Sequence, residues 1–488
     1  MRSNFDGNRG MFFPPLGLLL IAQSLKNAGY EVLLYDGNFD IDYKRKLFSC
    51  LSKNQNDILF LGFYLTLFQV KDMVDIARSV RAITNEIKII VGGPFPAVLS
   101  KVTMESDLVD IAVIGDGAKV VVDIADSELN KDSLKYVANI CFKENNKVIT
   151  NQRTLRDELN EYNWINYHNF IDIEGYVNKF RLYLLEQDKT IKRAVPILTG
   201  LGCSYKCSFC ENALLNHKHF SLPAENIIEQ IKFYHENYNI DSFAFFDEDF
   251  LFDKKRIIRL MELIEKSSLK IKWGSQSRVN YFNDGYVNAE FLSLMEKSGC
   301  VRLAMGVESG SPAMLKMLRK GIKPEQVIRA SECGKDSSIV FSYSLIVNLP
   351  EETYDDISMT VELMDRALSI KKNSFVSAVH QYLAYPETPL SIEMEKRLGS
   401  NLIKDISFEQ FAEFDMNTYN KKINPLKTDY RKECLMRHGL YSKEPLQFRI
   451  NIRWIFSILL RFVGRIRKSM NFYHVPVEMY LRKLMRFN

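Results

Sequence analysis

The sequence lacks any apolar run long enough to cross a membrane. Its longest near-apolar stretches, residues 58–68 and 16–22, are much shorter than the roughly 18 to 20 residues that a spanning helix needs. The first ten residues also lack a basic start followed by an apolar stretch and a small-residue cleavage site, so secretion is not indicated. With 488 residues, 46% of them hydrophobic, the chain can bury two ordinary cores. We expect a cytoplasmic protein of two domains plus an appendage.

Cysteine is scarce, because the 488 residues include only eight. In a long cytoplasmic chain, so few cysteines favour metal ligands and buried thiols over a disulfide framework. Three of them fall within eight residues, at positions 203, 207 and 210. The others stand alone and are best interpreted as small core residues: Cys50, Cys141, Cys300, Cys333 and Cys434.

The body of the chain carries no excess of positive charge. The formal net charge is +5, but residues 449–488 carry nine Lys or Arg against the single acid Glu478, which leaves the remaining chain near −3. A nucleic-acid enzyme would spread its basic residues over the catalytic domain, so nucleic acid is not the expected substrate.

The basic C-terminus has the pattern of an amphipathic helix. Apolar side chains recur at i and i+4 from Trp454 to Ile466, and four basic residues border that face: Arg453, Arg461, Arg465 and Lys468. Such a helix is either a lid packed on the preceding domain or a contact with an anionic membrane surface or a lipid-like substrate.

Residues 1–125 alternate short apolar strands with amphipathic helices. Strands are predicted at residues 31–36, 58–63, 87–91 and 111–114, and helices at 16–28 and 70–84. This rhythm predicts a doubly wound α/β domain whose ligand site lies at the carboxyl ends of parallel strands. Gly92, Gly93, Gly115 and Gly117 follow two of these strands, where they either line a ligand site or only make tight turns.

Residues 126–190 are predicted to form a connector with weak strands at 136–142 and 147–149. The rhythm resumes in residues 191–395, with strands predicted at 195–198, 242–246, 271–274, 303–307, 341–347 and 377–383. Six strands separated by helical patterns predict a partial (β/α)6 barrel with its chemistry at the carboxyl-end loops. Residues 396–488 are expected to be a helical region that ends in the basic tail.

The three clustered cysteines form a chelating loop. In the segment TGLGCSYKCSFCEN, spacings of three and two residues bring the thiolates of Cys203, Cys207 and Cys210 around one centre. A zinc site needs a fourth ligand, and the candidates His217 and His219 lie at spacings unlike the usual finger patterns. An iron–sulfur cubane with three cysteines keeps one iron open to an exogenous ligand. A cubane is preferred, with zinc as the alternative.

The pattern Cys-x3-Cys-x2-Cys, with the aromatic Phe209 before the last cysteine and just after the first barrel strand, resembles the radical S-adenosylmethionine (SAM) superfamily. The resemblance implies a 4Fe-4S cluster whose open iron binds the amino and carboxylate groups of SAM. It also implies that an electron, delivered by a donor such as flavodoxin or ferredoxin, cleaves the sulfonium to a 5′-deoxyadenosyl radical.

Segments at successive strand ends resemble SAM-binding elements of the same superfamily. The resemblance implies that residues 246–250 face the methionine ammonium and that Glu308 accepts ribose hydroxyls, while residues 273–280 resemble its third-strand element. Two positions depart from the family pattern, because Asn348 and Glu387 stand where glycine is expected. Taken singly, the charged residues could equally be capping or paired surface residues. The implied SAM-binding set is Phe209, Asp247, Glu248, Ser277, Arg278, Glu308 and Asn348.

Residues 11–120 resemble the cobalamin-binding domain that precedes the barrel in one large branch of this superfamily, through residues 13–18 and 91–94. The implied cobalamin-binding residues are Thr66, Gly92, Gly93, Gly115 and Gly117. No Asp-x-His-x-x-Gly occurs, so a histidine-ligated cobalt of the mutase type is not predicted. Only ten polar residues precede Met11, where the family has a first strand. We therefore expect the central strand to be missing and the cobalamin affinity to be low.

The preferred interpretation is a cobalamin-dependent radical enzyme that abstracts hydrogen from an unactivated carbon, with methyl transfer to that carbon as one outcome. A second hypothesis keeps the radical step but ends in cyclisation, rearrangement or oxidation. A third is a zinc-stabilised binding module without turnover. The sequence names no general base, nucleophile or substrate pocket.

Overall fold

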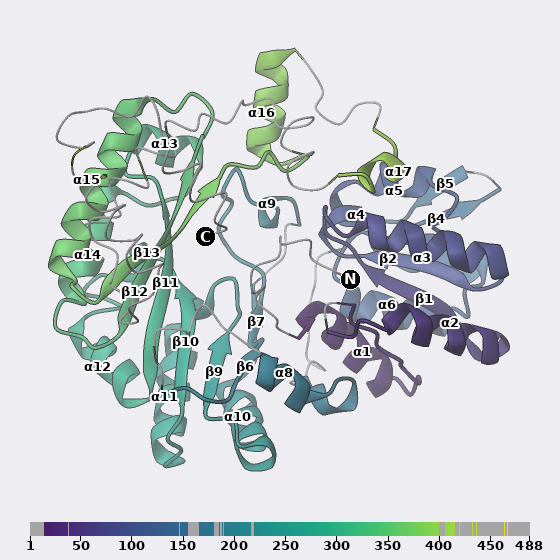
Figure 1. Cartoon of the computed structure of the whole chain (residues 1–488), viewed down its shortest axis with the longest axis horizontal. Coiled ribbons are helices and arrows are strands. Elements are labelled where there is room, and N and C mark those ends of the chain that lie inside the picture. The colour runs from purple at the N-terminus through teal and green to yellow at the C-terminus, as the bar shows by residue number, and fades with distance from the viewer. Residues whose placement is uncertain are drawn as a thin grey trace.

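The computed structural model describes residues 14–414 except 38, 146, 155–164, 180–184, 186–187, 189, 216–218 and 400–405, and beyond these only 419, 432, 436, 463 and 466. Its two large sheets, one of five strands and one of six, lie side by side with helices around them (Figure 1). The predicted basic helix of the C-terminus lies outside the described residues. None of the helices in the described part of the chain is long and apolar enough to span a bilayer.

The first sheet has the strand order β1-β2-β3-β4-β5. β1 (Phe60–Tyr64), β2 (Lys88–Gly92) and β3 (Ile111–Val113) are parallel, and β4 (Ile140–Glu144) and β5 (Lys147–Thr150) extend the sheet as an antiparallel hairpin. The predicted weak strands of residues 136–149 therefore form, but they belong to this sheet and not to a separate connector.

Helices cover both faces of the first sheet, which confirms the doubly wound prediction. α2 (Tyr43–Lys53), α3 (Val70–Ile83), α4 (Pro94–Val98) and α5 (Ser100–Glu105) pack on one face, and α1 (Leu16–Asn27) and α6 (Gly117–Asp126) on the other. The side chains of Ile89 and Val91 pack in the core beneath α2 to α5, and that of Ile90 packs in the core beneath α6. This alternation follows the two-residue period of a strand. The short α7 (Lys131–Leu134) precedes the hairpin.

β1 lies at an edge of this sheet in the described part of the chain. The prediction of a strand at residues 31–36 was wrong, because these residues join none of the described sheets. A strand needs a hydrogen-bonding neighbour, and this segment is held instead by α8 (Ile173–Lys179), where Tyr176 donates to Asp36 and stacks on Phe39. Leu33 is 60% exposed and Phe60 half-buried, which agrees with the expected exposure of apolar side chains near this edge.

The second sheet is wholly parallel, in the order β13-β12-β11-β10-β9-β6. Its strands are β6 (Ala194–Ile197), β9 (Ser242–Phe245), β10 (Lys272–Ser277), β11 (Cys300–Glu308), β12 (Val340–Val347) and β13 (Ser374–Gln381). Because β6 and β13 pair with no further strand among the described residues, the barrel is open. The predicted partial six-stranded barrel is confirmed.

The helices between these strands pack on the outer face of the barrel (Figure 1). They are α10 (Ala224–Tyr238), α11 (Lys254–Lys266), α12 (Ala289–Lys297), α13 (Pro312–Met317), α14 (Pro324–Cys333) and α15 (Tyr354–Ile370). In α11 the buried residues Ile257, Leu260, Met261 and Ile264 share one face at helical spacing. Asp253, Asn288, Ser311 and Thr353 cap four of these helices by accepting backbone N–H groups.

Residues that follow the barrel return to the first domain. α16 (Pro389–Leu398) is succeeded by α17 (Phe408–Phe411), which lies beside α5 and α3 (Figure 1). Phe408 and Phe411 pack edge-on against Phe95 of α4, with ring centroids 5.8 and 5.2 Å apart. The two domains are thus held together by apolar contacts from the C-terminal side.

Candidate functional site

The three clustered cysteines lie on one loop, residues 202–211, here called the cysteine loop. It follows the short strand β7 (Gly200–Leu201), which pairs with β8 (Phe220–Ser221), and leads into α9 (Asn212–Leu215). Gly202 adopts a φ of 80°, a left-handed conformation that glycine permits at little cost. Ser208 fixes the middle of the loop, because its N–H and hydroxyl donate to the carbonyls of Leu318 and Met317.

The donor set of this loop fits an iron–sulfur cluster. Cys207 is buried and Cys203 and Cys210 are half-buried, and burial raises the pKa of the Cys203 thiol and brings that of Cys210 to about 11. Among the described residues, no three His, Cys, Asp or Glu side chains are arranged so that they could all bind one metal ion. A cubane binds each cysteine at a different iron, so it does not require the three sulfurs to converge on one metal.

Asp247 has a different environment from the one predicted. Its two carboxylate oxygens accept hydrogen bonds from the Thr199 N–H (2.7 Å) and hydroxyl (2.6 Å), and Arg256 lies 3.6 Å away. The side chain is fully buried, and burial raises its pKa against the opposing effect of Arg256. The interpretation that Asp247 faces the methionine ammonium does not fit these contacts. Asp247 instead fixes Thr199, between β6 and β7, just ahead of the cysteine loop.

Ser277 also lies on the other side of its strand from the barrel lumen. It pairs in register with Met305 of β11, and residues in register on parallel strands point to the same face. Met305 belongs to the core beneath the outer helices, so a direct SAM contact by Ser277 does not fit. Glu248 is exposed and accepts the Gly202 N–H at 3.1 Å, so it supports the cysteine loop.

Phe209, Arg278 and Glu308, in contrast, converge beneath the cysteine loop. Glu308 pairs with Lys320 at 2.6 Å, both side chains being buried, and the Lys320 ammonium lies 5.9 Å from the centre of the Phe209 ring. Arg278 donates to the Lys320 carbonyl, and its guanidinium carbon lies 3.5 Å from the centre of the Tyr205 ring. Three residues of the predicted SAM set therefore meet in one charged group.

Gly306 makes room for this charged group. A Cβ at position 306 would lie 2.4 Å from a Glu308 carboxylate oxygen and 2.8 Å from the Lys320 nitrogen, closer than atoms can approach. The Glu308–Lys320 pair therefore depends on a glycine two residues before the carboxylate.

Glu308 and Asn348 are strained at neighbouring strand ends. Their φ angles are 64° and 62°, in the left-handed region that non-glycine residues rarely adopt. Asn tolerates this conformation better than most residues, which explains how Asn348 replaces the expected glycine; Glu387, the other replacement, has a φ of 61°. Such strain concentrates at functional sites, and the Asn348 N–H donates to Glu352 at 2.8 Å.

Sequence reasoning missed several residues around this site. Tyr281 donates to both oxygens of the buried Asp249 (2.9 and 2.8 Å), whose negative charge acts on Cys203. The Glu352 carboxyl has a pKa raised to about 7 by burial. Asp249, inside the segment 246–250, and Glu352, inside the segment that contains Asn348, each had a sequence signal. Lys320 and Tyr281, the last residue of a short 3-10 helix (Val279–Tyr281), had none, and only the fold brings them close.

The predicted cobalamin residues gather at the carboxyl ends of β1, β2 and β3. A Cβ on Gly93 would lie 2.8 Å from the Leu65 carbonyl oxygen, and one on Gly115 would lie 2.7 Å from Asn139. A Cβ on Gly117 would meet Ile21 at 3.2 Å, whereas one on Gly92 would make only ordinary contact. Close contact with neighbouring protein atoms is thus enough to explain why three of these four positions are glycine. The Thr66 N–H donates to the Gln69 side chain. A direct contact of these five residues with cobalamin stays a proposal.

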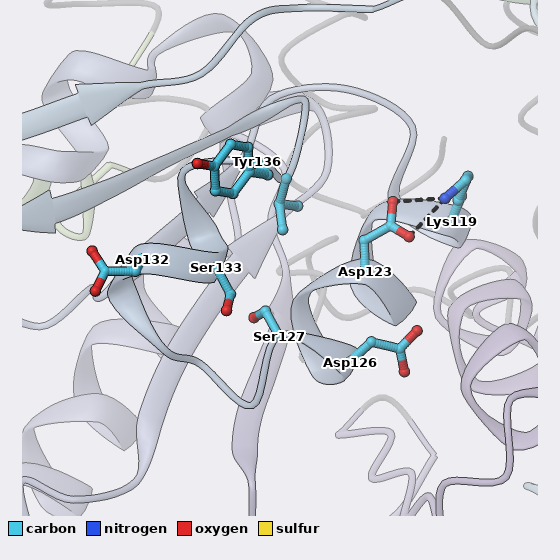
Figure 2. Close-up of a pocket in the computed structure, with 8 residues that line it drawn as sticks. Lys119, Asp123, Asp126, Ser127, Asp132, Ser133 and Tyr136 are labelled. Carbon is cyan, nitrogen blue, oxygen red and sulfur yellow. Dashed lines mark hydrogen bonds and ion pairs between the residues drawn. The ribbon is translucent and has the colours of Figure 1, made fainter.

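A surface groove of about 630 Å³ lies elsewhere, between α6 and α7. Figure 2 shows that its lining includes Asp123, Asp126 and Asp132. Each carboxylate already has a partner: Asp123 pairs with Lys119, Asp126 accepts from Tyr30, and Asp132 pairs with Lys135. The groove contains none of the predicted site residues.

Comparisons with known families agree with this geometry. Residues 197–364 match the radical SAM superfamily and residues 6–125 match the B12 binding domain. The chain belongs to the radical SAM superfamily, in the branch that carries a cobalamin-binding domain. It is therefore a radical SAM enzyme whose cofactors are a 4Fe-4S cluster, SAM and cobalamin, which sets the zinc alternative aside.

Individual relatives cover most of the chain. The "Uncharacterized methyltransferase PH0819" of Pyrococcus horikoshii is 28% identical over 408 residues, 82% of each chain. The solved structure of the cobalamin-dependent SAM radical enzyme OxsB has a TM-score of 0.72 at 20% identity, covering 98% of this chain and 73% of OxsB. That of the radical SAM methyltransferase TsrM from Kitasatospora setae has a TM-score of 0.66 at 14% identity, covering 94% of this chain and 97% of TsrM. These two structures share the fold of this protein.

Proposed function

We propose that this enzyme transfers a methyl group to an unactivated carbon of a small-molecule substrate. The observation that carries the proposal is the contact between α4, at the carboxyl edge of the cobalamin-binding domain, and α9, directly after the cysteine loop. A substrate at this junction would lie within reach of both cofactors, and such positioning is what a radical methylation needs. The name of the Pyrococcus relative, a methyltransferase, supports the same function.

Several residues of the chain would hold the cofactors. Cys203, Cys207 and Cys210 would bind the cluster, Glu308 would accept the ribose hydroxyls of SAM, and Arg278 would offer positive charge to the methionine carboxylate. When bound, the cluster and SAM supply a 5′-deoxyadenosyl radical and cobalamin supplies a methyl group.

The lumen of the barrel is suited to a reactive species. Ala194, Ala244 and Ala304 line it together with the partly buried Phe246. This apolar part of the lumen limits the access of water to a reactive species, and Gln276 and Ser342, which pair in register with Ala304, place polar groups on the same face. We propose a flavodoxin or a ferredoxin as the electron donor, and a lipid-like substrate or a membrane contact for the basic tail.

Methyl transfer is tested by following the label of SAM that carries a trideuterated methyl group. The reconstituted protein with hydroxocobalamin and a reductant should convert this SAM into trideuteromethyl-cobalamin, detected by mass spectrometry. Formation of 5′-deoxyadenosine without label in the cobalamin would instead favour the non-methylating hypothesis. A reaction without reductant is the control, because cobalamin must be reduced before it accepts a methyl group.

Among the described residues β1 has one unpaired edge, which predicts weak cobalamin binding. An edge strand lacks half of its ladder hydrogen bonds and leaves apolar side chains exposed, so the carboxyl edge beside it should be loosely ordered. Titration with methylcobalamin should give a low affinity, and adding one more parallel strand upstream of the present chain should raise it. Tight binding by the present chain, with a protease-resistant N-terminal half, would show that the sheet is completed in another way.

A further inference from the structure

A narrow cavity lies where the two domains meet the cysteine loop. Its lining from the first domain is apolar (Leu67, Pro94, Phe95, Val98 and Leu99), and the second domain adds Glu211, Tyr385 and Pro386. The cavity measures about 20 Å³, which is room for a group the size of one water molecule. Since Glu211 directly follows Cys210, a group bound here would lie beside the cluster-binding loop and against the cobalamin-binding domain.

Glu211 is the one charged side chain of the cavity lining. It has no ion-pair or hydrogen-bond partner for its carboxylate within the described part of the chain, although polar groups in such surroundings are normally paired. A carboxylate that served only to hold the two domains together would be expected beside a Lys or Arg, and none of the described residues provides one.

Two phenols accompany this carboxylate. Tyr385, which follows β13, lines the cavity together with Glu211, and the ring of Tyr64, the last residue of β1, lies beside Gly93, which precedes the lining residue Pro94. Neither hydroxyl has a hydrogen-bond partner among the described residues. A carboxylate can only accept hydrogen bonds, and aromatic rings attract cations, so this group matches an organic cation.

Resting on the proposed function above, we propose that Glu211, with Tyr385 beside it in the cavity lining, anchors a primary ammonium group of the substrate. The substrate class is then an amine whose charged end enters the narrow cavity and whose adjoining carbon chain lies on the apolar wall. Phe95 holds that wall in place, because Phe408 and Phe411 support its ring from behind.

The proposal is tested with n-butylammonium as the probe, with butanoate and 1-butanol of the same length as comparisons. Binding to the full chain, reconstituted with iron and sulfide, is followed by saturation-transfer NMR and calorimetry. The wild type should bind butylammonium and discriminate against butanoate, and Glu211→Gln should weaken the ammonium at least about tenfold, since a charge-assisted hydrogen bond is lost. Tyr385→Phe should weaken it less, and Glu290→Gln, an exposed carboxylate on α12, should change nothing.

Three results would overturn the proposal. These are equal butylammonium binding by wild type and Glu211→Gln, equal binding of butanoate and butylammonium by the wild type, and displacement of butylammonium by saturating SAM, which would assign the cation site to SAM itself. The second needs no variant, so misfolding of Glu211→Gln cannot hide a failure. Failure of the proposed function would be seen separately, as methyl label absent from cobalamin while the ammonium preference persists.

Discussion

Replacing Cys207 with alanine should abolish cluster assembly and SAM cleavage together. The wild type, reconstituted without oxygen, should hold about four irons per chain, because three thiolates and one open position suit a cubane. Cys207 is the buried member of the three and lies between the other two in the loop, so its loss leaves two thiolates, too few to retain the cluster. Iron and acid-labile sulfide analysis, with 5′-deoxyadenosine formation, measures both effects.

Cys333→Ala is the matched control for this prediction. Cys333 is a half-buried thiol that lies outside the cysteine loop, at the end of α14, so its loss should leave iron content and SAM cleavage unchanged. An unchanged iron content in Cys207→Ala would remove the cluster assignment from this loop. Zinc in place of iron and sulfide in the wild type would contradict it as well.

The barrel could be predicted because the buried strands of a parallel sheet have nearly continuous apolar sequences. The runs predicted at residues 242–246 and 341–347 form β9 (Ser242–Phe245) and β12 (Val340–Val347), with ends that nearly coincide. The cysteine spacing likewise needs no tertiary information, since the ligands lie on a single loop.

The facing of individual side chains could not be predicted in the same way. Asp247 and Ser277 lie in segments that resemble SAM-binding elements. However, the Asp247 carboxylate accepts hydrogen bonds from Thr199 and pairs with Arg256, and the Ser277 side chain faces the core beneath the outer helices. A shift of one residue in a strand reverses the face, and β10 carries a register shift between residues 273 and 274. Sequence resemblance locates a strand end, but packing decides which side chain reaches the lumen.

The strand expected at residues 31–36 failed for a related reason. Its alternating pattern satisfies the local requirement for a strand, but a strand also needs a partner, and β1 pairs only with β2 among the described residues. Local pattern and tertiary pairing disagree here, and pairing prevails.

Glu308→Gln should weaken SAM binding while sparing the cluster. A neutral amide replaces a carboxylate that would accept ribose hydroxyls, and losing a hydrogen bond to a charged group costs about 1.5–3 kcal/mol, which corresponds to about a ten- to hundredfold higher dissociation constant. Equilibrium binding of SAM to the reconstituted protein gives this constant, and iron content shows that the cluster remains.

The Glu308–Lys320 pair complicates this variant and also supplies its control. Removing one partner of a buried ion pair is destabilising by about 3–5 kcal/mol, because the other charge is left uncompensated. Glu308→Gln should therefore unfold at lower denaturant concentration than the wild type, and Glu308→Gln combined with Lys320→Met should recover much of that stability. If Glu308 contacts SAM, the double variant will be stable and still bind SAM weakly. If its role is only to neutralise Lys320, affinity will return along with stability, and equal affinity in the wild type and the double variant would make Glu308 a structural residue.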